Sequence, residues 1–192
     1  MKVCLISAIH LWVNPRLVKE ADALLEKGYE VEVITCSKDI WSDERDKVLC
    51  LAKPWKALRI HMLKNSFLGL ITWFLMAARQ RFFFELSKII SNSVRIAEES
   101  YYRGYPLALK YALKAKADLY IAHGQAALPL ASRAAKYHKV RYAFDCEDLN
   151  AEALADGGRD PQIKKNIEAI ERHYLPKASY VQATSSPMAE FL

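Results

Sequence analysis

The first 35 residues have the pattern of a complete strand, helix and strand unit, and they constrain the fold more than any other stretch. Lys2 to Ile9 is a short, mostly apolar run, typical of a parallel strand that is buried on both faces. Asn14 is placed to cap a helix that begins at Pro15, and Gly28 follows its last turn. Val31 to Ile34 then provides a second strand. A crossover this compact predicts a right-handed β-α-β unit.

The turn after the first predicted strand contains no glycine. A dinucleotide-binding turn carries the pattern G-x-G-x-x-G, because glycines let the backbone approach the pyrophosphate closely. Residues 8–16 lack that pattern, so the sequence gives no support to binding of NAD or FAD.

Length and composition predict one domain. A chain of 192 residues with 52% hydrophobic content can bury one sizeable core, which predicts a single domain over residues 1–192. The four cysteines show no C-x-x-C spacing, so we expect free thiols and no zinc site. The longest apolar run, Phe67 to Ala78, has 12 residues, whereas a spanning helix needs roughly 20. Without a secretory signal pattern at the start, a cytoplasmic protein is expected.

Strands and helices are expected to alternate along the rest of the chain. This order is typical of an α/β fold with a Rossmann-like, doubly wound and mostly parallel sheet. Cys36 to Lys56 is polar and is interpreted as irregular. The further strands are expected at Leu58 to Leu63, Asp118 to Ala122, Val140 to Phe144 and Ser179 to Thr184. Helices are expected at about 65–100 and at Pro161 to Leu175, with two more between them, one that ends at Lys116 and one that ends at about Tyr137.

Three segments carry a resemblance to a known family. NPRLVKEADALLEKGYEVEVIT, ADLYIAHGQAALPLASRAAKYHKVRYAFDCEDL and IERHYLPKASYVQATSSPMAEFL occur in the order and spacing of the amino-terminal, acceptor-side domain of family 4 GT-B glycosyltransferases. The resemblance implies a retaining enzyme that moves a sugar from a nucleotide sugar to a glycan or lipid-linked acceptor. It also implies a carboxyl-terminal, donor-binding domain that is absent from this chain, which we therefore expect to be part of a longer enzyme and inactive alone. The alternatives are another GT-B member, such as a sugar-nucleotide epimerase, and a stand-alone binding module.

The predicted site lies in the loops that follow the strands, where open α/β sheets bind ligands. The resemblance places His123 where the family has a cleft histidine that contacts the donor sugar, with Gly124 beside it. A neutral imidazole with a pKa near neutrality would donate to a hydroxyl and handle a proton. The alternative is a histidine that only bonds a neighbouring carbonyl.

Glu147 and Asp148 are the second pair of candidates. A carboxylate there would accept a hydrogen bond from an acceptor hydroxyl, although a solvated acidic loop explains the pair equally well. Cys146 occupies the position where family members often have a histidine. The pattern Asp145-x-Glu147 faintly resembles the Asp-x-Asp metal motif of another glycosyltransferase fold, which nothing else in the chain supports. We therefore expect no metal and no cofactor, with the nucleotide sugar acting as substrate.

The first loop contributes His10, Asn14 and Arg16 to the predicted substrate-binding set. Amides at a helix N-terminus bind phosphate, and Arg16 could clamp one with both arms of its guanidinium. For Asn14 the alternative is helix capping alone. For Arg16 it is an ion pair with Glu20 at i+4.

Residues 53–116 hold 12 Lys and Arg against 3 Glu, a local net charge of +9, together with many aromatic residues. A helix with this composition could contact the inner face of a membrane and present the domain to a lipid-linked acceptor. A nucleic-acid partner is not expected, because no binding module is present. The other interpretation is that Phe67 to Ala78 is a buried helix of the fold. The residues of the membrane interpretation are Trp73, Phe74, Arg79, Arg81, Phe82 and Phe83.

Overall fold

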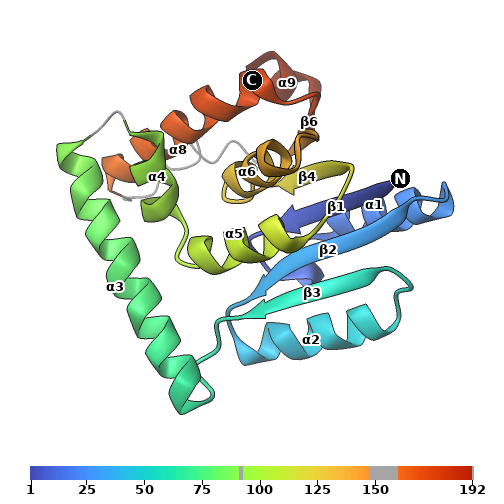
Figure 1. Cartoon of the computed structure of the whole chain (residues 1–192), viewed down its shortest axis with the longest axis horizontal. Coiled ribbons are helices and arrows are strands. Elements are labelled where there is room, and N and C mark those ends of the chain that lie inside the picture. Colours follow the sequence, from blue (N-terminus) through green and yellow to red (C-terminus); the bar gives the residue numbers. More distant parts are fainter. Residues whose placement is uncertain (91–92, 148–159, 192) are drawn as a thin grey trace.

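The computed structural model describes residues 1–90, 93–147 and 160–191. Six parallel strands form one sheet in the order β3-β2-β1-β4-β5-β6 (Figure 1). The order reverses direction between β1 and β4, so a topological switch point lies at their carboxyl ends. The predicted doubly wound α/β fold is confirmed. The strands are β1 (Lys2–Ser7), β2 (Glu30–Ser37), β3 (Lys56–His61), β4 (Leu119–His123), β5 (Arg141–Cys146) and β6 (Val181–Ala183).

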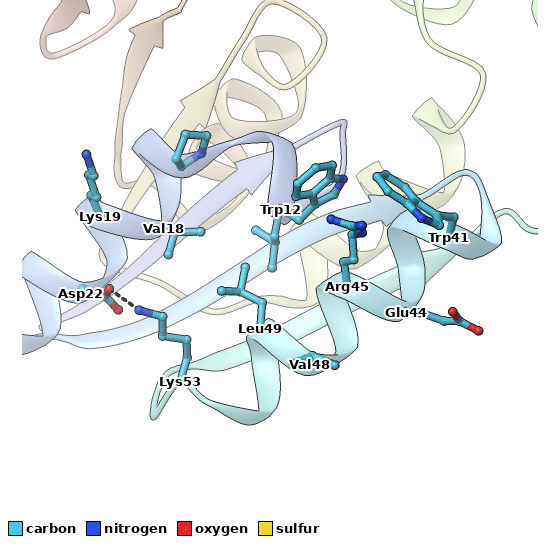
Figure 2. Close-up of a pocket in the computed structure, with 12 residues that line it drawn as sticks. Trp12, Val18, Lys19, Asp22, Trp41, Glu44, Arg45, Val48, Leu49 and Lys53 are labelled. Carbon is cyan, nitrogen blue, oxygen red and sulfur yellow. Dashed lines mark hydrogen bonds and ion pairs between the residues drawn. The ribbon is translucent and has the colours of Figure 1, made fainter.

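Helices cover both faces of the sheet. On one face lie α1 (Pro15–Glu26) and α2 (Ile40–Leu51), packed on Val3 and Leu5 of β1. On the other lie α5 (Tyr105–Lys114), α6 (Leu128–His138) and α8 (Pro161–Tyr174), packed on Cys4 and Ile6. Because side chains alternate along a strand, β1 contributes to both cores. Between α1 and α2 a groove remains open (Figure 2).

The first helix begins where the sequence predicts. The Asn14 Oδ1 accepts a hydrogen bond from the Leu17 amide at 3.0 Å, and Pro15 occupies the first helical position. Gly28 follows the helix with a φ of +82°, a left-handed conformation that glycine adopts without strain. The structure confirms the predicted cap and stop.

The second helix was missed in the sequence, where Cys36 to Lys56 was interpreted as irregular. Asp39 caps α2, because its Oδ1 accepts a hydrogen bond from the Ser42 amide at 2.8 Å. The inner side of α2 buries Ser42 and Asp46, so a buried polar face concealed the apolar periodicity on which the prediction relied.

The predicted helical stretch at 65–100 consists of two helices, α3 (Phe67–Ile89) and α4 (Val94–Tyr101). The Gln80 side chain of α3 donates to the Ser100 carbonyl of α4, so one side of α3 rests on the domain. The interpretation of Phe67 to Ala78 as a buried helix is wrong, since large apolar residues of α3 are exposed. A helix that is apolar nearly all round does not reveal which side is covered. The exposed large apolar residues of α3 are Phe67, Leu68, Leu70, Ile71, Phe74, Leu75, Phe82 and Ile89.

The remaining elements are η1 (Leu11–Val13), η2 (Leu175–Lys177) and α9 (Ser186–Phe191). In the part of the chain that the structure describes, no helix combines the length and apolar character needed to cross a bilayer.

A buried carboxylate joins four helices on the second face of the sheet. Glu98 of α4 receives the Arg133 guanidinium of α6, with Nε to Oε2 at 2.7 Å and Nη2 to Oε1 at 3.0 Å. The hydroxyls of Tyr105 in α5 and Tyr174 in α8 also donate to it. Burial raises the pKa of both tyrosines, so both remain hydroxyl donors at neutral pH.

Replacing Glu98 with Gln should lower the free energy of unfolding by about 3 kcal/mol, because the half-buried Arg133 would lose its counter-charge and the hydroxyls of Tyr105 and Tyr174 their charged acceptor. Urea denaturation followed by circular dichroism measures the change. The matched control is Glu168→Gln, which removes only an exposed ion pair with Lys164 at 3.9 Å. A loss no larger for Glu98→Gln than for the control would contradict this role of Glu98.

Candidate active site

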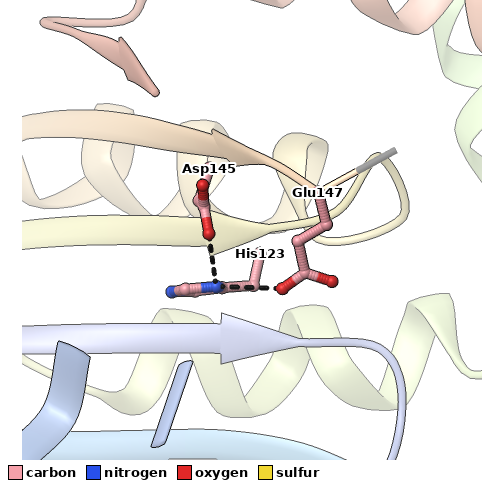
Figure 3. A group of neighbouring side chains, drawn as sticks. All are labelled: His123, Asp145 and Glu147. Atoms are coloured by element: carbon pink, nitrogen blue, oxygen red, sulfur yellow. Dashed lines mark hydrogen bonds and ion pairs between the residues drawn. The ribbon is translucent and has the colours of Figure 1, made fainter. Parts of the chain in front are cut away.

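Charged side chains from three elements meet at the carboxyl ends of β4 and β5, beside the switch point. His123 is the last residue of β4 and pairs in register with Asp145 of β5, and Glu147 follows β5. In Figure 3 the Asp145 and Glu147 carboxylates both reach the same ring nitrogen of His123. Helix α1 adds Arg16, which contacts Asp145, and Glu20, which contacts His123.

The His123 side chain is fully buried and surrounded by three carboxylates. Its Nδ1 lies 3.2 Å from the Asp145 Oδ2 and 3.2 Å from the Glu147 Oε1. Its Nε2 lies 2.8 Å from the Glu20 Oε2, in a charge contact without the alignment of a hydrogen bond. Both ring nitrogens therefore face negative charge.

These contacts change the protonation state that the sequence suggested. Burial disfavours a charged imidazole, but Asp145, Glu147 and Glu20 outweigh it and raise the pKa of His123 to about 10. Burial also acts against the Asp145 carboxylate, yet His123 and Arg16 outweigh it and lower the pKa of Asp145. The expectation of a pKa near neutrality for His123 is corrected, because the ring is a cation at pH 7.

Arg16 binds Asp145 with both arms of its guanidinium. Its Nε lies 3.0 Å from Oδ2 and its Nη2 lies 2.5 Å from Oδ1. The alternative ion pair with Glu20 is not formed, because Glu20 turns toward His123 instead. About a third of the Arg16 side chain remains exposed at 35%, so one edge is open to solvent. The phosphate clamp stays a prediction.

His10 lies in the scaffold of the first loop. Its Nε2 accepts a hydrogen bond from the Lys38 amide at 2.9 Å, so the proton lies on Nδ1, which donates to Asp46 Oδ2 at 3.1 Å. The buried Asp46 carboxylate also accepts from the amides of Leu11 and Trp12 at 3.1 Å and 2.8 Å. His10 thus fixes the loop, and its contact with a substrate stays a prediction.

The other predicted residues have different surroundings. Asn14 is buried, and its Nδ2 has no hydrogen-bond partner among the described residues. Gly124 has a φ of +78°, and its amide donates to the Asp145 carbonyl at 3.1 Å, which fixes the turn after β4. Cys146 is buried in the core on the opposite face, because alternate residues of β5 point to opposite sides. Asp148 lies outside the described residues.

His123, Asp145 and Glu147 each offer one atom to a metal ion, and these atoms lie within 4.8 Å of one another. Binding of a metal would require a neutral His123, because an imidazolium has no free lone pair. It would also compete with Arg16 for Asp145. In the described conformation Arg16 and the His123 imidazolium already neutralise part of the negative charge of the carboxylates.

Glu20 and Asp145 belong to the site although neither was among the predicted site residues. The spacing of Arg16 and Glu20 at i and i+4 places both on one side of α1, which was interpreted as a pair between them. His123 and Asp145 end neighbouring strands, so their contact follows from the register of β4 and β5. That register was available only from the structure.

Comparison with known proteins supports the fold. No protein-family model matches the sequence, and no curated protein matches it. Among solved structures, the crystal structure of the glycosyltransferase VinC in complex with DTDP matches with a TM-score of 0.51 and 16% identity. The match covers 97% of this chain and 49% of the VinC chain, so this chain spans about half the length of that structure. The chain therefore has a glycosyltransferase-like Rossmann fold, consistent with one half of a GT-B protein.

The His123 cation should make stability depend on alkaline pH. A folded-state pKa of about 10, above the ordinary 6.5, stabilises the fold fully below pH 6.5 and loses this effect as pH rises through 10. The difference in unfolding free energy between the wild type and His123→Gln should shrink above pH 6.5, by up to about 1.4 kcal/mol per pH unit. Urea unfolding at several pH values measures it, and NMR titration of the ring should place its pKa near 10. A ring that titrates near 6.5 would refute the buried imidazolium.

Proposed function

We propose that this chain is the acceptor-side half of a family 4 GT-B glycosyltransferase. In this proposal the full enzyme moves a sugar from a nucleotide sugar to a glycan or lipid-linked acceptor, and a second half binds most of the nucleotide. The observation that carries the proposal is the charged cluster at the switch point of a sheet that shares its fold with half of a glycosyltransferase. Ligands of open α/β sheets bind at this place.

The cluster contains groups suited to a sugar. Glu147 is the most accessible of the carboxylates in contact with His123 Nδ1, and an ionised carboxylate accepts hydrogen bonds from hydroxyls. Outside the cluster, at the start of α1, the Asn14 Nδ2 is a buried donor without a partner among the described residues. In the proposed mechanism Glu147 turns from the buried His123 ring to the acceptor hydroxyl. A hydroxyl of the donor sugar then takes the place of Glu147 and shares the Nδ1–H of His123 with Asp145. Arg16 keeps Asp145 ionised and so keeps His123 protonated and oriented.

We also propose that the outward side of α3 contacts the inner face of a membrane. Phe74 and Phe82 are 66% and 62% exposed on this helix. Arg81 beside them is also exposed, and its guanidinium pairs with Glu85 of the same helix at 2.5 Å, at the surface rather than with a buried group. An apolar stripe with basic neighbours suits the boundary between lipid head groups and acyl chains. Arg79, however, pairs with the buried Glu99 at 2.8 Å and is part of the scaffold, so it does not belong to the proposed contact.

Trp73 and Phe83 also lie less openly than the sequence suggested. Both side chains are half-buried. Trp73 has the ammonium of Lys64 over its ring at 3.7 Å and the guanidinium of Arg103 at 4.5 Å. Phe83 is in edge contact with Phe82. We place the membrane contact on the exposed residues of α3 and assign the half-buried ones to its support.

In the full-length enzyme, Asp145→Asn should lower kcat for sugar transfer at least about a hundredfold, because it releases Arg16 and the orientation of His123. Transfer of labelled sugar from a panel of nucleotide sugars to membrane lipid extract is measured, with Glu168→Gln as the control. EDTA should leave the rate unchanged, since the proposal uses no metal. An isomerised nucleotide sugar without a transferred product would indicate an epimerase, and binding without turnover a binding module; either outcome contradicts the proposed transferase.

The double variant Phe74→Ser, Phe82→Ser should abolish co-flotation with vesicles that contain phosphatidylglycerol. The wild type should float with these vesicles and less so at high salt, because the basic residues add a screened attraction. The matched control is Leu51→Ser on α2, which removes an apolar side chain that is 81% exposed elsewhere. Equal flotation of the double variant and the control would rule out α3 as the contact.

A further inference from the structure

The groove between α1 and α2 is a second concave site, separate from the charged cluster. Its volume is about 790 Å³, within the range of roughly 300–1,000 Å³ that is usual for sites of small molecules. Much of its lining is apolar, with the fully buried Leu11 beneath it and the exposed Val48 at the rim. Val18 and Leu49 line it between these two (Figure 2). Such a surface favours a ligand with an apolar body.

One end of this groove is a preformed aromatic wall. The rings of Trp12 and Trp41 meet edge to face with centroids 5.1 Å apart. The Arg45 guanidinium lies 3.7 Å from the Trp41 ring centroid and 4.5 Å from that of Trp12. Trp12 is also held through its amide by the buried Asp46 at 2.8 Å. A wall that is ordered before the ligand arrives costs little entropy on binding.

Charge on the rim indicates the polar end of the ligand. Lys53 is neutralised by Asp22 at 2.5 Å. Arg45, Lys19 and the carboxylate Glu44 also border the groove, and none of the three forms an ion pair within the part of the chain that the structure describes. The lining therefore keeps a net charge of +1 from three cations and two carboxylates, and beside an apolar surface this excess fits an amphiphile with an anionic head.

Helix α1 forms a partition between this groove and the charged cluster. Pro15, Val18 and Lys19 line the groove, whereas Arg16 and Glu20 face His123 and Asp145. The spacing of the two sets at 3.6 residues per turn places them on different sides of the helix. A molecule in the groove and a molecule at the cluster would therefore contact different sides of the same helix.

We propose that the groove binds the hydrocarbon chain of a lipid phosphate, with Arg45 pairing with the phosphate. Binding of the lipid phosphate does not depend on the proposed transferase. Only its role as the acceptor of the sugar rests on that proposed function. The hydrocarbon packs on Leu11, Val18 and Leu49, and the tryptophans close one end.

Decyl phosphate, below its micelle concentration, is the probe, and the change in tryptophan fluorescence of the 192-residue chain reports binding. We expect saturable binding that is weakened about tenfold by Val48→Asp, which places a charge at the apolar rim. Arg45→Ala should weaken binding of decyl phosphate but not of decanol. Leu51→Asp, on the same helix but outside the groove, is the control and should bind as the wild type does.

Absence of saturable binding, equal binding by Val48→Asp, or equal affinity for inorganic phosphate alone would overturn the inference. The test is independent of transferase activity, because it needs no nucleotide sugar. If transfer fails while decyl phosphate binds as expected, the groove assignment stands and the proposed function falls. If transfer to a lipid acceptor occurs with an unchanged KM in Val48→Asp, the groove assignment falls and the proposed function stands.

Discussion

The bidentate ion pair between Arg16 and Asp145 ties the first helix to the fifth strand, and the geometry of the site depends on it. A buried carboxylate is tolerated only when hydrogen bonds and opposite charge replace its hydration. Asp145 receives both from Arg16 and His123. His123 in turn stays charged because Asp145, Glu147 and Glu20 raise its pKa. Helix α1 and strands β4 and β5 are therefore held in one relative position by charge as well as by apolar packing.

Much of the fold could be predicted because its signals are local. Asn14, Pro15 and Gly28 determine where α1 begins and ends, and the apolar runs determine the strands. The second helix could not be predicted in this way, since its buried side includes the polar Asp46. Asp46 is explained only by partners in a distant loop, namely His10 and the amides of residues 11 and 12.

The candidate site was predictable in position but not in electrostatics. Strand ends gave His123 and Glu147, because parallel strands deliver their carboxyl ends to one edge of the sheet. The charge of His123 depends on Glu20 of α1 and on Asp145 and Glu147 at the end of β5. Of these three, only Glu147 was among the predicted site residues. Which side of α3 is exposed could not be predicted from the sequence either, since it depends on where α4 and α8 pack against this helix.

Helix α1 contributes residues both to the groove and to the charged cluster. Its residues line an apolar groove on one side and a network of charge on the other. A ligand that displaces α1 from the groove side must also alter the Arg16 to Asp145 contact. Thermodynamic linkage then requires that occupancy of either side changes the affinity of the other by the same factor.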